Sequence, residues 1–368
     1  MRQQYLSSVK VLDMTRVLAG PICTMMLGDL GANVIKIERP VHGDDTRGWG
    51  PPFDSDGESA YFLSINRNKW SVAADLDDPA DQALVRRLVA GADVVVENFM
   101  PGALERRGLG AAELLAACPR LIWCTIVGYG VGDPRPGYDF AIQAERGWMA
   151  ITGEPDGAPM KAGVALADVI AGKDAAVAIL AGLVGRGVAD AERHVVISLA
   201  HSATAALVNV AQNVLVSGQD AGRWGNAHPN LVPYQLLQAA DRPIVLAVGN
   251  DAQWARCADV LGLAPDSAWA TNAGRSANRK GLVEAVAARI AERPAAEWVR
   301  RLGAVGVPTG LVRTVTEALS DVDCSAVTGV APVGPGRIRY RPPRLDEHGT
   351  KVRAAGWEAF SGERPGSL

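Results

Sequence analysis

One acidic side chain in an apolar run is the strongest candidate for chemistry in this sequence. Asp168 lies within residues 161–172, where most neighbours are small or aliphatic and lead into an alanine-rich segment. A charge in such surroundings is costly unless it is hydrogen-bonded, caps a helix or takes part in chemistry. Asp168 is therefore either the N-cap of the helix that begins here or a carboxylate that takes part in catalysis.

The elements that precede Asp168 predict a parallel sheet covered by helices. Strands are expected over 9–13, 34–38, 93–97 and 121–127, with another at 194–198. Helices are expected between them, opening at Pro21 and near Asp78 and covering 111–117. Apolar strands that alternate with helices are typical of a doubly wound α/β domain. Such sheets bind ligands beyond the carboxyl ends of their strands, so we expect the site there.

The loops that leave those strand ends carry groups suited to a nucleotide-like ligand. They hold residues 16–21, Arg39, Asn98 with Phe99, and the glycines of 128–132. A dinucleotide cradle needs a third glycine and a helix start, but Asp133 and Pro134 stand there instead. The sequence therefore argues against a nicotinamide dehydrogenase, and no NAD is expected.

Composition limits the partners. The 368 residues are 48% hydrophobic and 21% charged with a net charge of −3, which fits a globular protein without a basic surface. We expect neither nucleic acid nor an anionic membrane as a partner. The five cysteines lack the paired spacing of a zinc site or disulfide framework, so no metal is expected. Without a signal-peptide pattern or an apolar run of 18 residues, the predicted location is cytoplasmic.

Four segments are predicted along the chain. Residues 1–200 form a large Rossmann-like domain, 201–225 a connecting helix and linker, 226–325 a small α+β domain, and 326–368 an extended return to the large domain. Helices are expected to about residue 183 and over 202–216, 252–261, 280–293 and 295–303. A strand is expected over 243–248 and a short extended piece from 311, while 223–235 is predicted to be a loop.

Eight short motifs follow one another along the chain. They are 17–21 (VLAGP), 27–38 (LGDLGANVIKIE), 66–69 (NRNK), 96–99 (VENF), 136–139 (PGYD), 161–168 (KAGVALAD), 225–229 (GNAHP) and 342–343 (PP). On these motifs the chain resembles the class III CoA-transferases, the family of formyl-CoA transferase and carnitine CoA-transferase. The family also includes the 2-methylacyl-CoA racemases.

The resemblance implies a reaction and an assembly. It implies an interlocked homodimer that takes coenzyme A from an acyl-CoA donor to a carboxylic acid acceptor. Asp168 would be the nucleophile, passing through mixed anhydrides and an aspartyl-CoA thioester. A free aspartate with a pKa of about 3.9 is already ionised at neutral pH, so no general base is needed. The small residues Ala165, Ala167, Ala171 and Gly172 are expected to leave room for the thioester.

The resemblance also implies binding residues. Val17, Leu18 and Ala19 would line the CoA channel, with Arg39 and Arg106 near its phosphates and Ala74, Asn98, Phe99 and Tyr138 beside the rest of CoA. Tyr61, Gly249 and Asn250 would contact the acyl or acceptor group. The alternatives are that each arginine is a solvated surface charge and that Phe99 is a core aromatic.

Tyr138 distinguishes the two reactions of the family. The racemases resemble this segment but carry a histidine at this position, because they must move a proton next to the thioester. Tyrosine is a poor base at neutral pH, so we favour transfer over racemisation. A 2-methylacyl-CoA racemase or epimerase and a catalytically silent CoA-binding homologue are the alternatives.

Several positions depart from the family pattern. Leu18 replaces a glutamine of formyl-CoA transferase, which disfavours formyl or oxalyl transfer, and Gly249–Asp251 replaces its glycine-rich loop. The loop 130–136 is short, Trp70 stands where a basic residue is common, and His201 where an acid is common. The donor and acceptor acids are not specified, although a dicarboxylate such as succinate is a reasonable donor. The cations that could bind the acceptor are Arg16, Arg67 and Arg275.

Overall fold

The computed structural model describes residues 4–188 and 192–361, which separate into two compact units. Unit 1 contains the chain up to residue 148, residues 161–212 and the chain from residue 322, and unit 2 contains 149–160 and 213–321. The sequence-based boundaries at 200, 226 and 326 thus differ from this division by a few residues to about a dozen, and the short piece 149–160 was assigned to the large domain. The ends of the first and last predicted segments, 1–3 and 362–368 with Pro365, lie outside the described residues.

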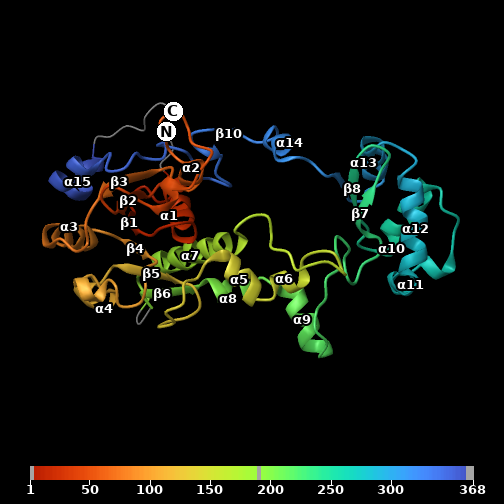
Figure 1. Cartoon of the computed structure of the whole chain (residues 1–368), viewed down its shortest axis with the longest axis horizontal. Helices are drawn as coiled ribbons and strands as arrows, with labels where there is room; N and C mark the ends of the chain where they lie inside the picture. Colours follow the sequence, from red (N-terminus) through yellow and green to blue (C-terminus); the bar gives the residue numbers. More distant parts are fainter. Residues whose placement is uncertain (1–3, 189–191, 362–368) are drawn as a thin grey trace. The chain divides into compact units, whose positions relative to one another are not determined.

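Unit 1 is built on a six-stranded parallel sheet in the order β3-β2-β1-β4-β5-β6. Its strands are β1 (Lys10–Met14), β2 (Asn33–Glu38), β3 (Lys69–Ala73), β4 (Val94–Glu97), β5 (Ile122–Val127) and β6 (His194–Ser198). The predicted α/β class with a parallel sheet is confirmed. The strand order reverses between β1 and β4, so the loops after these two strands border the crevice where such sheets bind ligands (Figure 1).

Helices cover both faces of this sheet. One face packs against α1 (Ala19–Asp29) and α7 (Leu166–Val184), and the other against α3 (Pro79–Ala90) and α4 (Ala111–Ala117). Successive residues of a strand point to opposite faces, and β1 follows this rule. Val11 joins the core on the α7 side, while Leu12 joins the core on the α3 side. Both faces are buried, which is why these strands read as continuous apolar runs.

Helices α1 and α7 touch at small residues. A Cβ at Gly172 would lie 2.3 Å from Cγ2 of Ile22 and 2.5 Å from the carbonyl oxygen of Ala19, so only glycine fits there. Ala167 and Ala171 are fully buried on the same helix. We expected small residues here to leave room for a thioester, but Ala167, Ala171 and Gly172 are buried between the helices. They allow two helices to pack closely.

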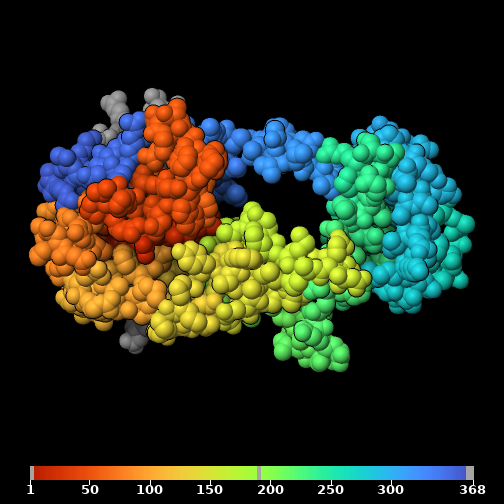
Figure 2. Space-filling view, viewed as in Figure 1, coloured from red at the N-terminus to blue at the C-terminus, as the bar shows by residue number. Residues whose placement is uncertain are grey.

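Strand β3 was missed by the sequence analysis. Its first residue is Lys69, a poor marker of a central strand, yet the side chain is fully buried. The C-terminal segment lies beside it: Asn68 Oδ1 accepts hydrogen bonds from the backbone N–H of Arg339 at 2.6 Å and of Tyr340 at 3.0 Å. Figure 2 shows this blue segment against the red and orange N-terminal part of unit 1. It also contains helix α15 (Gly349–Ala355), where only extended chain was expected.

Unit 2 has a three-stranded antiparallel sheet in the order β7-β8-β9 with helices packed on it. The strands are β7 (Tyr234–Gln238), β8 (Pro243–Ala247) and β9 (Thr309–Leu311); the helices are α10 (Asp251–Leu261), α11 (Asn272–Ala277), α12 (Arg279–Ile290) and α13 (Ala295–Ala304). Strand β7 begins at the end of the predicted loop 223–235. The core of unit 2 centres on Trp254 and Trp298.

The remaining elements are short. They are α2 (Ala60–Ile65), α5 (Asp139–Glu145), α6 (Trp148–Ile151), α8 (Leu199–Ala205), α9 (Val208–Ser217), α14 (Val315–Leu319), β10 (Cys324–Ser325), β11 (Gly329–Val330) and the 3-10 turns Asp45–Gly48, Glu105–Arg107, Ser267–Trp269 and Gly356–Phe360. The helix predicted over 202–216 is broken before Val208, whose φ is 44°. In the described part of the chain no single helix could span a membrane. Helices α8 and α9 together have the length and composition, but they are bent by 71°.

Candidate active site

Asp168 stands in the first turn of α7, and it is not the N-cap. The cap position is Ala165, which has no side-chain hydrogen bond. The cap comes from another helix: Oδ1 of Asp139, the first residue of α5, accepts from the backbone N–H of Ala167 at 2.8 Å and of Asp168 at 3.4 Å. The N-cap interpretation of Asp168 is therefore wrong, and its own carboxylate is left for another role.

The Asp168 carboxylate is nearly buried and unpartnered. The residue is 8% exposed, and no donor among the described residues reaches its carboxylate oxygens. Burial and the negative charge of Asp139 raise the pKa of Asp168 to about 7 from its ordinary 3.8. The assumption of an ordinary, fully ionised aspartate was therefore wrong. With this pKa about half of the molecules carry the charge at pH 7.

A cavity of about 220 Å³ opens onto Asp168. It is lined by six of the predicted binding residues: Val17, Leu18, Ala19, Asn98, Phe99 and Tyr138. They come from the loop after β1, the start of α1, the loop after β4 and the residue before α5. None of the described residues that line this cavity is a histidine. Strand-end position predicted Val17, Leu18, Ala19, Asn98 and Phe99, and the family resemblance predicted Tyr138.

The loop between β1 and α1 is held in a strained shape. Val17 has a φ of 70°, which is unfavourable for a β-branched residue. Asn98 clamps the preceding residue, because its Oδ1 accepts from Arg16 N–H at 3.0 Å and its Nδ2 donates to Arg16 O at 2.9 Å. Val17 N–H donates to Asp44 Oδ1 at 3.3 Å. The amide of Asn98 thus binds the loop, and the start of α1 has no side-chain cap.

Four buried charged side chains stabilise the loop between β1 and α1. Lys69 Nζ lies 2.9 Å from Asp13 Oδ2, and Lys36 Nζ lies 2.9 Å from Asp44 Oδ2 while donating to Thr15 O at 2.7 Å. Burial opposes the ionisation of Asp13, but the two lysines outweigh it and hold the pKa of Asp13 well below its usual range. Burial lowers the pKa of Lys69 to about 8. Breaking such a pair leaves an uncompensated buried charge.

A second cavity of about 210 Å³ shares Arg16 and Phe99 with the first. Arg39 and Ala74 line it, as does Arg107. The predicted Arg106 lines neither cavity. Both arginines belong to one 3-10 turn, where a step of one residue rotates the side chain by about 120°. The sequence could not decide which of the two faces the cavity.

The arginines of the two cavities are paired with acids. Arg39 forms an ion pair with Asp45, which also lies 3.3 Å from Arg16. Arg107 pairs with Asp77 at 2.8 Å. The alternative that Arg39 is a solvated surface charge is partly right, because half of its side chain is exposed.

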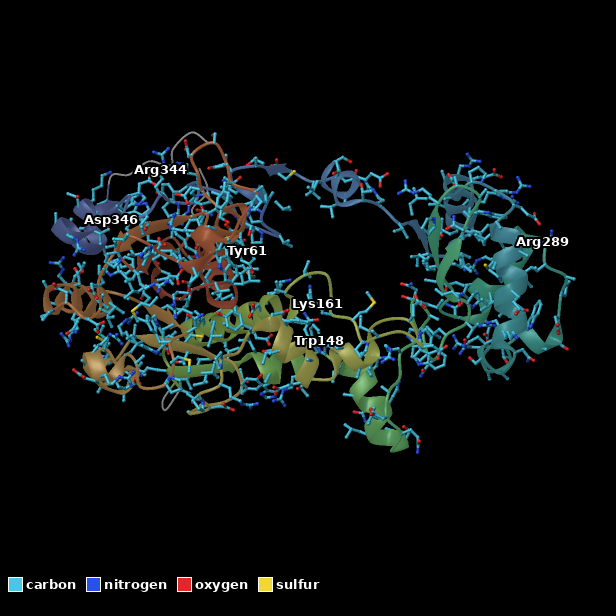
Figure 3. All side chains as sticks on the ribbon, viewed as in Figure 1. Tyr61, Trp148, Lys161, Arg289, Arg344 and Asp346 are labelled. Carbon is cyan, nitrogen blue, oxygen red and sulfur yellow. The ribbon has the colours of Figure 1, made fainter. Side chains whose placement is uncertain are left out.

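Tyr61 on α2 lies in the electrostatic field of Asp168. Burial and then the charges of Asp168, Asp139 and Asp44 raise the pKa of Tyr61 to about 12. Its phenol therefore stays protonated over the physiological range and can donate a hydrogen bond. Figure 3 labels Tyr61 on α2 and Lys161 in the loop that leads to α7.

Two of the three candidate acceptor cations have structural roles. Arg67 is buried and binds Asp29 with two nitrogens, at 2.9 and 2.7 Å. Arg275 is buried in unit 2, where it binds Asp251 and backbone carbonyls. Of the three, Arg16 lines the Asp168 cavity.

Four other residues named in the sequence analysis do not line the Asp168 cavity. Trp70 is buried in β3, stacked between His348 and Phe360, and His201 is exposed on α8. Gly249 and Asn250 belong to unit 2, where Asn250 is the N-cap of α10 and Gly249 N–H bonds Gln253.

The short loop between β5 and α5 closes on itself through two glycines. A Cβ at Gly128 would lie 2.5 Å from Cα of Gly137, so the two backbones are in direct contact. Arg135 lies between them in the sequence and stacks on the ring of Tyr129, with 3.7 Å to the ring centre. The glycines of 128–132 resemble a phosphate cradle in the sequence, but Gly128 instead allows the loop to close against Gly137.

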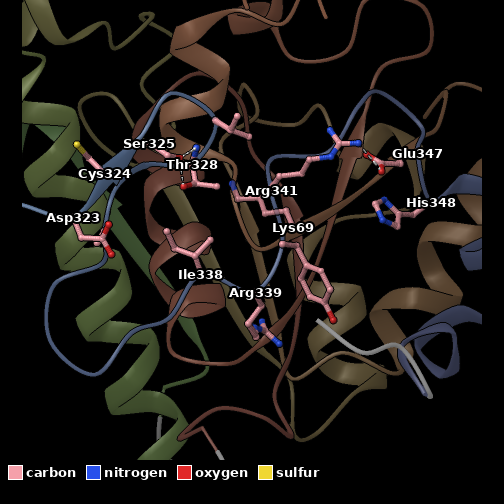
Figure 4. A pocket seen from close by; sticks show the side chains of 14 residues that line it. Lys69, Asp323, Cys324, Ser325, Thr328, Ile338, Arg339, Arg341, Glu347 and His348 are labelled. Atoms are coloured by element: carbon pink, nitrogen blue, oxygen red, sulfur yellow. Dashed lines mark hydrogen bonds and ion pairs between the residues drawn. The ribbon is translucent and has the colours of Figure 1, made fainter. Parts of the chain in front are cut away.

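Another cavity of unit 1 is not lined by Asp168. Its volume is about 640 Å³, and it is lined by Lys69 and by residues of 323–331 and 338–348 (Figure 4). Several of its charged groups have partners: Arg341 binds Glu347 at 3.0 Å, and Arg339 donates to backbone carbonyls of Gly28 and Ala32. Within 4–188 and 192–361 no group of three or more histidine, cysteine or acidic side chains could hold a metal ion.

Comparison with known proteins decides the family. Residues 6–355 match the family described as CoA-transferase family III. The chain belongs to CoA-transferase family III. It is 44% identical over 322 residues to the succinyl-CoA:glutarate CoA-transferase of Mus musculus, an alignment that covers 86% of this chain and 74% of the mouse protein. It is 39% identical to the succinate–glutarate CoA-transferase of Agrobacterium fabrum, with 96% of each chain covered.

A solved structure agrees with this assignment. The fold matches a CaiB/BaiF family protein from Brucella suis with a TM-score of 0.85 and 39% identity, covering 96% of this chain and 99% of that one. The predicted family and the prediction of a transferase enzyme are confirmed. The alternative of a catalytically silent homologue is not supported by relatives that carry enzyme names.

Proposed function

We propose that this enzyme moves coenzyme A from succinyl-CoA to a second dicarboxylic acid, with Asp168 as the covalent carrier. The observation that carries the proposal is the unpartnered, nearly buried Asp168 carboxylate at the cavity lined by Val17, Leu18 and Ala19. The substrates are suggested by relatives named for succinyl-CoA and glutarate. Leu18 supports an acyl group larger and less polar near the thioester than formyl, because it offers no side-chain amide.

The four steps balance without any proton transfer. A carboxylate oxygen of Asp168 attacks the succinyl carbonyl carbon, the C–S bond breaks and CoA thiolate leaves a mixed anhydride. The thiolate then attacks the Asp168 carbonyl carbon, and succinate departs with the bridging oxygen. The acceptor carboxylate attacks the aspartyl-CoA thioester, giving a second anhydride and free thiolate. Attack of the thiolate on the acceptor carbonyl yields the new acyl-CoA and restores the Asp168 carboxylate.

The surrounding groups suit these steps. The backbone N–H groups at the start of α1 lack a side-chain cap and border the cavity, so they can stabilise the oxyanion of each tetrahedral intermediate. The protonated Tyr61 phenol can donate to the acyl or acceptor carboxylate. The absence of a histidine among the described cavity residues, together with Tyr138, supports transfer over racemisation.

The two cavities suggest how CoA binds. Arg16 and Phe99 line both, so a ligand that passes these residues can occupy the two together. We place the thioester beside Asp168 and the phosphates near Arg39 and Arg107, where they would replace Asp45 and Asp77 as partners. A homodimer, as the family resemblance implies, is part of the proposal.

An oxygen-labelling experiment tests the covalent role of Asp168. The enzyme is incubated with succinyl-CoA and glutarate whose carboxylates carry ¹⁸O. In the proposed mechanism Asp168 receives one labelled oxygen from glutarate in each turnover and passes it to a later succinate. Mass spectrometry should find ¹⁸O in the peptide that contains Asp168, and Asp168→Asn should abolish transfer.

The matched control is Asp174→Asn, an exposed acid on the same helix whose carboxylate accepts from Ser202. It should retain both turnover and labelling of Asp168. Turnover with labelled succinate but an unlabelled Asp168 peptide would refute covalent catalysis at this residue, because direct exchange between the two acids bypasses the protein.

A further inference from the structure

Asp139 occupies a position that no part of the proposed reaction has used. It is the first residue of α5, it follows Tyr138, and it faces the first turn of α7. Every oxygen of its carboxylate is engaged. Oδ1 accepts from the backbone N–H groups of Ala167 and Asp168, and Oδ2 accepts from Gln143 Nε2 at 2.7 Å.

Gln143 extends this contact to the loop before α7. The residue is fully buried, and its Oε1 accepts from the backbone N–H of Ala162 at 2.8 Å. A continuous chain of hydrogen bonds therefore runs from Ala162 through Gln143 and Asp139 to the turn that carries Asp168. The chain fixes the backbone on both sides of Val164, which itself is exposed and makes no core contact.

We propose that Asp139 is a positioning residue for the nucleophile: its carboxylate fixes the turn on which Asp168 stands and places a negative charge beside that turn. The proposal rests on the proposed function of Asp168 as the covalent carrier. A carboxylate that holds its proton more tightly also attacks an acyl carbon more readily, since both reactions use the same oxygen lone pair.

The other charges around Asp168 are paired among themselves. The titratable side chains that border it are Asp139 of α5, Tyr61 of α2, Arg16 and Asp45 of the loops after β1 and β2, and Asp133, Arg135 and Tyr138 of the loop after β5. Arg16 pairs with Asp45, and Arg135 pairs with Asp133 at 2.8 Å. Tyr61 is neutral at the relevant pH. On α7 itself, Lys173 and Asp174 are exposed and do not line the cavity.

Asp139 is the neighbour whose negative charge faces Asp168 without a cation between them. Its hydrogen-bond partners are two backbone N–H groups and a neutral amide. Such partners leave its net charge in place. The charge of Asp139 is also the one whose repulsion contributes, after burial, to the raised pKa of Asp168.

Asp139→Asn separates the charge from the cap. The asparagine Oδ1 can still accept from Ala167, because asparagine caps helices as well as aspartate does. Its Nδ2, however, would face Gln143 Nε2, and two donors cannot bond. The double variant Asp139→Asn/Gln143→Glu restores this bond with the donor reversed, and the glutamate can still accept from Ala162. It also returns a negative charge at a greater distance from Asp168.

The first measurement needs no turnover. A water-soluble carbodiimide with an amine labels protonated carboxyl groups, and mass spectrometry of the peptide containing Asp168 gives the extent of labelling at each pH. We expect the midpoint to fall by roughly one pH unit in Asp139→Asn, since a like charge close to a carboxyl shifts its pKa by at least that much. The double variant should lie between Asp139→Asn and the wild type. Asp174→Asn, the matched control on the same helix, should titrate as the wild type does.

The second measurement is the pH profile of kcat/KM for succinyl-CoA. In the wild type the value at pH 6 should be about one tenth of that at pH 8, and in Asp139→Asn about half, following the fraction of ionised Asp168. An unchanged labelling midpoint and pH profile in Asp139→Asn, with only the melting temperature lowered, would overturn the proposal and leave a purely structural role. If the wild type transferred CoA from no donor while the labelling midpoint still moved, the proposed function would fail and the coupling between Asp139 and Asp168 would stand.

Discussion

Replacing the proposed nucleophile should stabilise the folded protein above neutral pH. Folded Asp168 keeps its proton up to about pH 7, whereas in the unfolded chain it loses the proton near 3.8. Between these values the folded state binds more protons than the unfolded state, so the free energy of unfolding falls as pH rises, by about 1.4 kcal/mol per unit. Above pH 7 the accumulated cost is constant, at about 4 kcal/mol.

The variant Asp168→Asn cannot ionise and escapes this cost. Its stability advantage over the wild type should grow by about 3 kcal/mol between pH 5 and pH 8, because two of these three pH units lie below the folded-state pKa. The assay is urea denaturation of both proteins at pH 5, 6, 7 and 8, at one protein concentration because association contributes to stability. Asp174→Asn is the control and should show no pH-dependent advantage. An advantage that is the same at pH 5 and pH 8 would refute the raised pKa.

Three further predictions concern the same region. The kcat/KM of the wild type should rise about tenfold from pH 6 to pH 8 as Asp168 ionises, and a flat profile would contradict the raised pKa. Lys69→Met should lower the free energy of unfolding by about 3 to 5 kcal/mol in urea, because Asp13 loses its buried partner; Asp13→Asn in the same chain should recover part of the loss. Gly137→Ala should destabilise by about 1 to 3 kcal/mol, since its Cβ would lie 2.1 Å from Cα of Gly128, whereas Gly130→Ala has no atom within 4 Å and should be neutral.

Apolar periodicity was enough to predict most of the sheet. Five of the six strands of unit 1 were predicted within one or two residues, because each reads as a mostly apolar run; four of them are largely buried, and β6 lies at the edge of the sheet. Strand β3 was not, since its first residue is Lys69, whose burial depends on an ion pair with the distant Asp13. The break between α8 and α9 was also missed, because nothing in a run of helix-forming residues marks the positive φ of Val208.

The residues that line the site were easier to predict from the sequence than their ionisation. Strand-end position and family motifs brought Val17, Leu18, Asn98 and Tyr138 to one cavity with Asp168. The ionisation of Asp168 could not be read from the sequence, because it depends on which acid packs against α7.

A signal for Asp139 was nonetheless present. It is the last residue of the motif PGYD, beside Tyr138, but no role was predicted for it. The sequence carries no signal that decides whether Arg106 or Arg107 lines the second cavity. This choice depends on the rotation of a short 3-10 turn, which neither charge nor spacing specifies.

The contact between Gly172 and the carbonyl of Ala19 joins α1, which borders the Asp168 cavity, to α7, which carries the proposed nucleophile. Because Gly172 of α7 packs directly on Ile22 and the Ala19 carbonyl of α1, neither helix can slide or tilt to admit a bulkier acyl chain without moving the other. We expect substrate range to diverge through other walls of the cavity, such as the side chains of Leu18 and Phe99 and the loop that carries Arg135 and Tyr138. Libraries that aim to change the acid this enzyme accepts should therefore vary those walls and leave the helix pair untouched.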